Sequence, residues 1–163
     1  MSDYYVKNLA VSLPLKDAVA IIDNAIEIGH QHGLLPLTVV VLDVGGNIIA
    51  IKREDGCGIM RVDIAAGKAW GALGMGISSR EIRDRLADRP SFQAALASTS
   101  QGRFVPVPGG VLICNEETEV IGAVGISGDA SDKDEYCAIA AINTTKYLSH
   151  PEKPNDKWQN AGL

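Results

Sequence analysis

Apolar residues recur with a helical period over residues 12–33. Alanine and isoleucine occupy positions three and four residues apart, which places them on one helix face: Ala18, Ile21, Ile22, Ala25 and Ile28. Pro14 suits the first turn, where its missing N–H would have no partner, and Gly33 suits the C-terminal stop. The pattern predicts a long amphipathic helix at the start of the fold.

Two β-branched runs follow this helix, at residues 37–42 and 48–51. The segment between them contains Gly45 and Gly46, which adopt the positive φ angles of tight turns without steric cost. We therefore predict a β-hairpin.

The middle of the chain has the pattern of three helices. A helical period continues through residues 59–73, after a polar bend. Ser78 with Glu81 three residues later has the form of a capping box, and Pro90 suits the first turn of a further segment through residue 96. We predict one longer helix and two short ones.

The last third predicts three strands and a closing helix. Residues 103–107, 111–114 and 120–126 are short apolar runs separated by proline, glycine or acidic turns. Acidic residues then begin a helical pattern over 129–148, and negative charge stabilises a helix N-terminus. The order of elements predicts an α+β fold with one largely antiparallel sheet covered by helices.

Length and composition predict a single globular domain. The chain has 163 residues, of which 46% are hydrophobic and 21% charged. We assign residues 1–150 to this domain, and we expect the polar tail of residues 151–163 to be an arm ordered against another subunit.

Charge and hydropathy narrow the range of partners. A net charge of −5 without a compensating basic cluster disfavours nucleic acid. The start of the chain has no signal-peptide pattern, and no apolar run reaches the ~18 residues that a membrane span requires. We therefore expect a cytoplasmic protein without a membrane partner.

The three cysteines, Cys57, Cys114 and Cys137, are odd in number and widely spaced. This arrangement fits neither a secreted disulfide framework nor a paired-cysteine zinc site. We interpret them as buried free thiols.

Four segments together carry a family resemblance: Val-Leu-Asp-Val-Gly-Gly at 41–46, Gly-Lys-Ala at 67–69, Pro-Val-Pro-Gly-Gly at 106–110, and Gly-Ala-Val-Gly-Ile-Ser-Gly at 122–128. In this order they resemble the GlcG/HbpS family, often called haem-degrading proteins, and the C-terminal part of PduO-type cobalamin adenosyltransferases. The resemblance covers residues 14–148.

This resemblance implies a sheet of about five antiparallel strands flanked by helices, in a profilin/PAS-like α/β/α arrangement. It also implies a homodimer or higher homo-oligomer, with a pocket for a small ligand near the subunit contact. The ligand itself stays open, because some members of the family bind haem and others have no firm role.

The predicted helix at 59–73 carries the candidate catalytic residues. Arg61 and Lys68 fall on one face, with small residues between them. Arg61 could grip a carboxylate through two hydrogen bonds, and a desolvated Lys68 could stabilise a developing negative charge. Asp55 and Glu54, just before the helix, could exchange the proton. Alternatively, these charges are structural, with Lys68 extending from a half-buried face.

Glycines supply the candidate ligand-binding positions. Gly67, Gly71 and Gly74 form a stripe on the same helix, which close backbone packing explains better than direct ligand contact. Gly109 and Gly110 expose backbone N–H groups that could serve an anionic ligand.

Ser127 adds a hydroxyl to this candidate site, within the glycine-rich run 122–128. The run is not a dinucleotide fingerprint, because its glycine spacing is wrong and no βαβ unit follows. We therefore do not expect NAD as a cofactor.

The histidines have no metal-ligand spacing, so we predict no metal site. His30 and His32 near a helix C-terminus are typical of exposed capping residues, and His150 begins the tail. If haem binds, His30 is the candidate ligand among the histidines, and a tyrosine or lysine is the other option.

Three functions stay open. The leading hypothesis is a cofactor-independent proton-transfer enzyme, a tautomerase, isomerase or related lyase acting on a small anionic, carboxylated metabolite of a catabolic pathway. The first alternative is a haem-binding or tetrapyrrole-sensing protein, in which the same cations meet the propionates. The second is a non-catalytic accessory protein of a catabolic enzyme, with Trp158 in the tail as a contact.

Overall fold

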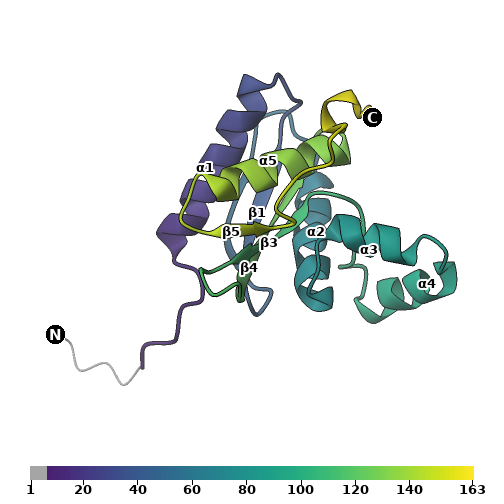
Figure 1. Cartoon of the computed structure of the whole chain (residues 1–163), viewed down its shortest axis with the longest axis horizontal. Coiled ribbons are helices and arrows are strands. Elements are labelled where there is room, and N and C mark those ends of the chain that lie inside the picture. Colours follow the sequence, from purple (N-terminus) through teal and green to yellow (C-terminus); the bar gives the residue numbers. More distant parts are fainter. Residues whose placement is uncertain (1–6) are drawn as a thin grey trace.

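The computed structural model describes residues 7–163 and has one sheet between two layers of helices (Figure 1). The elements in chain order are α1 (Leu15–Gln31), β1 (Thr38–Asp43), β2 (Ile48–Arg53), α2 (Arg61–Met75), α3 (Ser79–Leu86), α4 (Pro90–Thr99), β3 (Gly110–Cys114), β4 (Val120–Ser127), α5 (Ser131–Asn143), β5 (Leu148–His150) and a 3₁₀ turn η1 (Trp158–Asn160). The predicted domain starts at residue 1, and its first six residues lie outside the described range.

The five strands form one antiparallel sheet in the order β2-β1-β4-β3-β5. Strand β4 lies at the centre, where Val124 is opposite Val41 of β1 and Val111 of β3. This sheet confirms the predicted α+β class with a single antiparallel sheet.

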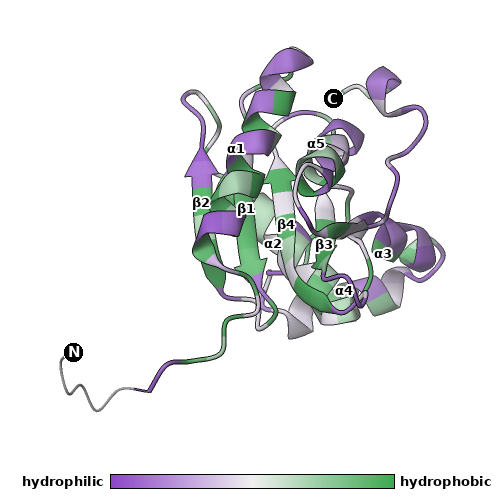
Figure 2. Cartoon of the chain, turned by 60° about the vertical axis from the view of Figure 1, so that its left-hand side comes forward, coloured by the Kyte–Doolittle hydropathy of each residue, from purple (hydrophilic) through white to green (hydrophobic). Residues whose placement is uncertain are grey.

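The two faces of the sheet have separate cores because side chains alternate along a strand. Val39 and Val41 of β1 belong to the core under α1 and α5, whereas Val40 and Leu42 belong to the core under α2. Figure 2 shows the apolar strands enclosed between these helices. The three layers agree with the arrangement that the resemblance implies.

Helix α2 lies very close to the sheet because glycines on the strands leave room for it. A Cβ atom added to Gly125 of β4 would overlap the carbonyl oxygen of Ala65, and one on Gly110 of β3 would overlap the carbonyl of Lys68. The glycines noted in these strands therefore fix the depth of α2, and with it the position of every side chain that α2 carries.

One predicted strand is wrong. Residues 103–107 form no strand, because Pro106 cannot donate a hydrogen bond to a ladder, and this segment packs on α2 instead. The fifth strand is β5, which pairs Leu112 of β3 with His150. The closing helix is shorter than its pattern predicts, because α5 ends at Asn143 and Leu148 lies in β5.

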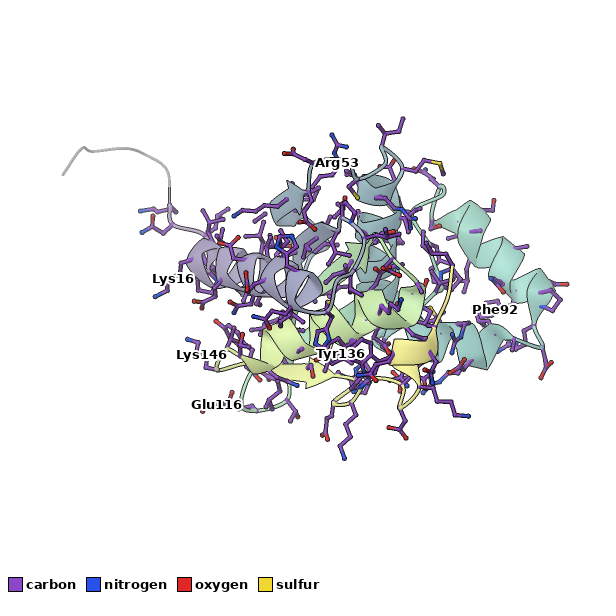
Figure 3. The ribbon with its side chains drawn as sticks, turned by 90° about the horizontal axis from the view of Figure 1, so that it is seen from above. Lys16, Arg53, Phe92, Glu116, Tyr136 and Lys146 are labelled. Atoms are coloured by element: carbon purple, nitrogen blue, oxygen red, sulfur yellow. The ribbon has the colours of Figure 1, made fainter. Side chains whose placement is uncertain are left out.

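The tail packs on its own chain. The ring of Trp158 stacks on Tyr136 of α5 with centroids 3.6 Å apart and an interplanar angle of 7°. His32 meets Trp158 edge-on at 5.2 Å. Figure 3 shows Tyr136 on α5 beside the tail. The tail therefore has ordering contacts within its own chain, and its contact with another subunit stays a prediction.

Two local predictions are confirmed. The capping box of Ser78 and Glu81 begins α3. The three cysteines are free and buried. Within residues 7–163, no helix has both the length and the hydropathy needed to cross a bilayer.

Candidate functional site

Lys68, predicted as a catalytic cation, lies in a buried ion pair. Its Nζ donates to Asp134 Oδ2 at 2.9 Å and to the carbonyl oxygen of Ile126 at 2.8 Å, and its side chain is 2% exposed. Gly109 makes room for the ammonium, because an added Cβ would lie 2.9 Å from Nζ. Since Lys68 belongs to α2 and Asp134 to α5, the pair joins the two helical layers past the end of β4.

Burial sets the electrostatics of this pair. It lowers the pKa of Lys68 below the usual amine value, and the attraction of Asp134 opposes the shift. It also raises the pKa of Asp134, against the attraction of Lys68. The other oxygen of Asp134 accepts the backbone N–H of Asp129 at 3.0 Å. These contacts support the structural interpretation of Lys68.

Arg61 begins α2 and lies half-buried beside the end of β4. Its Nη1 donates to Ser127 Oγ at 3.2 Å. The structure therefore brings two predicted site residues into contact. The nearby positive charge of Arg61 also contributes to the lowered pKa of Lys68. The predicted cations thus share one end of the sheet, but Lys68 faces inward to Asp134.

Glu54 and Asp55 do not join this cluster. Glu54 Oε2 accepts the backbone N–H of Leu37 at 2.6 Å, and Oε1 lies 2.5 Å from His30 Nε2. Asp55 is exposed in the turn that follows β2. Glu54, which was predicted to exchange a proton with a substrate, instead links the end of α1 to the start of β1.

The glycine stripe of α2 receives another segment of the chain. An added Cβ on Gly67 would lie 2.5 Å from Val105 Cγ2, and one on Gly71 would lie 3.1 Å from Phe104 Cδ2. A Cβ atom added to Gly74 would have no other atom of residues 7–163 within 4 Å, apart from its own turn of the helix and its chain neighbours. Close packing therefore explains the first two positions, which is the interpretation that the sequence favours.

A second region, which the sequence did not reveal, is a hollow of about 430 Å³ beside β3 and β5. It lies beyond the end of α2 at Gly76, on the side of the sheet that α2 covers elsewhere. Its apolar wall consists of Leu112, Cys114, Val120 and Leu148. Only the pairing of β5 with β3 creates this wall, so no local pattern could have predicted it.

His150 lines the same hollow. Its Nε2 lies 3.0 Å from Glu81 Oε2, and its second ring nitrogen has no hydrogen bond within residues 7–163. Burial raises the pKa of the neighbouring Cys114, which keeps that thiol protonated. The hollow thus combines an apolar wall with one available imidazole nitrogen.

Solved structures share this three-layered antiparallel fold. The complex of the PduO C-terminal domain with haem superposes with a TM-score of 0.77 at 27% identity, over 86% of this chain and 99% of that domain. Klebsiella pneumoniae protein ORFY superposes with a TM-score of 0.73 at 28% identity, over 87% of this chain and 96% of that protein. HbpS, at 24% identity and a TM-score of 0.70, covers 86% of this chain and 94% of its own and has the same fold.

The chain belongs to the HbpS-like family, described as haem degrading protein HbpS-like, whose model matches residues 13–143. It is 31% identical to an uncharacterised 15.0 kDa protein of the dhaT-dhaS intergenic region of Citrobacter freundii, over 85% of this chain and 92% of that protein. It is 29% identical to the corrinoid adenosyltransferase PduO of Salmonella typhimurium, over 82% of this chain but 40% of PduO. The resemblance noted in the sequence is confirmed.

Proposed function

We propose that this chain binds haem in the hollow beside β3 and β5, with His150 as the iron ligand. The observation that carries the proposal is the likeness to the haem complex of the PduO C-terminal domain, which extends over 86% of this chain at 27% identity. The description of the HbpS-like family supports the same ligand. This makes the first alternative function the better supported one.

The two histidine candidates fit haem to different degrees. A haem site needs a ligand atom next to apolar surface. The side chain of His30, the ligand expected from the sequence, is 60% exposed, against 44% for His150, and each histidine has its Nε2 against a glutamate. The hollow next to Glu54 is lined by Lys52, Arg53 and Asp55, which do not suit a macrocycle. His150 fits better, because it borders an apolar wall.

The residues around His150 would orient its imidazole and cover the bound haem. Glu81 holds one ring nitrogen, and a carboxylate in that position fixes the tautomer and raises the basicity of a metal-binding histidine. Leu112, Val120 and Leu148 would exclude water from one face of the bound group. Haem in this site would supply the iron chemistry. The predicted contact of Lys68 with a haem propionate has no support, because the Lys68 ammonium is already paired with Asp134.

Titration with haemin, followed by the Soret absorption, tests the proposal. We expect saturable binding by the wild type, loss of the ligated spectrum in His150→Ala, and its recovery when free imidazole is added. His30→Ala is the matched control and should retain the wild-type spectrum. A ligated spectrum that persists in His150→Ala, or the absence of haemin binding by the wild type, would overturn the proposal.

The proton-transfer activity has no support in the contacts of Lys68 and Glu54. Self-association stays a prediction of the resemblance, and a native mass spectrum would measure it. Binding of a small anionic metabolite also stays a prediction, and a second hollow, which does not include Lys68, suits such a ligand better.

A further inference from the structure

A hollow of about 480 Å³ lies between the β1–β2 turn, α2 and the loop after α4. Its volume is in the range of small-molecule sites. Leu42, Ile48 and Ala66 contribute apolar surface, and Trp70 and Arg103 contribute an indole and a guanidinium. None of the roles described above uses this hollow.

Arg103 and Trp70 form one unit in this wall. The guanidinium carbon of Arg103 lies 4.4 Å from the centroid of the Trp70 ring, in a cation–π contact. Arg103 Nε donates to the carbonyl oxygen of Ser100 at 3.1 Å. Within residues 7–163, the other N–H groups of Arg103 and the indole N–H of Trp70 have no acceptor. The wall is therefore rich in unpaired donors.

The unpaired N–H groups of Arg103 and Trp70 indicate which kind of ligand the hollow would bind. The free edge of a guanidinium matches a carboxylate through two parallel hydrogen bonds, which lie in the plane of the guanidinium. Asp63 is the one acidic residue among those that line the hollow, and its negative charge opposes anions, especially dianions. The combination favours one carboxylate on a small apolar body.

We propose that this hollow binds a small apolar monocarboxylate, with its carboxylate on Arg103 and its apolar body against the surface of Ile48. This is the class of small anionic metabolite that the sequence predicts as a partner, held by Arg103 instead of Arg61 and Lys68. The site is separate from the hollow of His150, so the proposal does not depend on haem binding.

The test follows the indole N–H resonance of Trp70 by ¹H–¹⁵N NMR during a titration with benzoate. Trp158→Phe assigns the signal, because the chain has two tryptophans. We expect a saturable shift of the Trp70 signal with benzoate and an unmoved Trp158 signal. Benzamide, which lacks the charge, should bind at least several-fold more weakly.

Two substitutions should act in opposite directions. Arg103→Met removes a charge-assisted pair of hydrogen bonds and should weaken benzoate binding about tenfold or more. Asp63→Asn removes a repelling charge and should strengthen it several-fold. Arg89→Met is the matched control, because Arg89 makes a similar contact with Phe92 at 4.6 Å and does not line the hollow.

Three outcomes would overturn the proposal. They are the absence of a saturable Trp70 shift, equal shifts of both indole signals, and undiminished benzoate affinity in Arg103→Met. The dispersion of the amide spectrum verifies in the same sample that each variant is folded. Failure of haemin binding would leave these measurements unchanged, so the two proposals fail independently.

Discussion

The ammonium of Lys68 and the carboxylate of Asp134 lie 2.9 Å apart, and each side chain is at most 2% exposed. One belongs to α2 and the other to α5, so their contact ties together the layers on opposite faces of the sheet. Removing one partner of a buried pair leaves an uncompensated charge in a region of low polarity.

Lys68→Met should therefore destabilise the fold by about 3–5 kcal/mol, measured by chemical denaturation. Asp134→Leu should have a comparable effect, and the double variant should lose less than the sum of the two. Lys52→Met is the control, because the Lys52–Asp23 pair is about half exposed and should contribute less than about 1 kcal/mol. If Lys68→Met behaved like Lys52→Met, the structural role would be refuted.

Glu135 makes stability depend on pH. Burial raises the pKa of this carboxyl to about 7, and the nearby guanidinium of Arg80 opposes the shift. The folded state therefore binds the proton more tightly than the unfolded state, where the value is near 4.5. Protonation of Glu135 therefore stabilises the folded state, and this contribution is fully present below pH 4.5. It amounts to up to about 3 kcal/mol and is lost as the pH rises from 4.5 to about 7.

Glu135→Gln should flatten this part of the pH profile of the unfolding free energy, measured by urea denaturation from pH 5 to pH 8. Glu117→Gln, at an exposed turn position, is the control and should leave the slope unchanged. Identical slopes for the wild type and Glu135→Gln would contradict the assignment to this carboxyl.

Two glycines of α2 should respond oppositely to alanine. Gly67→Ala places a methyl group 2.5 Å from Val105 Cγ2 and should destabilise the fold by about 1–3 kcal/mol. Gly74→Ala places a methyl group where the described part of the chain leaves open space, and it should stabilise the fold by up to about 1 kcal/mol, because alanine is the better helix former. Thermal unfolding distinguishes the two, and equal effects would contradict the close packing at Gly67.

The stack of Trp158 on Tyr136 should hold the tail on α5. Trp158→Ala should lower stability by about 1 kcal/mol or more, whereas Trp158→Phe should retain most of the stacking energy. Amide hydrogen exchange of residues 151–163 should increase in the alanine variant alone. Unchanged exchange in that variant would show that other contacts hold the tail.

The sequence by itself determined most of the secondary structure. The helical period predicted α1, the β-branched runs on either side of two glycines predicted β1 and β2, and the spacing of Ser78 and Glu81 predicted the start of α3. These signals are local, because they arise from side-chain periodicity and from backbone groups a few residues apart. The order of the motifs also determined the family.

Tertiary structure decided the rest. The short strand β5 has no periodicity of its own and exists because it pairs with β3, and that pairing creates the hollow beside His150. The sequence placed Lys68 on a helix face, but only the packing of α2 and α5 around the sheet end gave it Asp134 as a partner. Arg103 and Trp70, 33 residues apart in the chain, meet for the same reason. Which charges lie together depends on long-range packing, which local patterns do not encode.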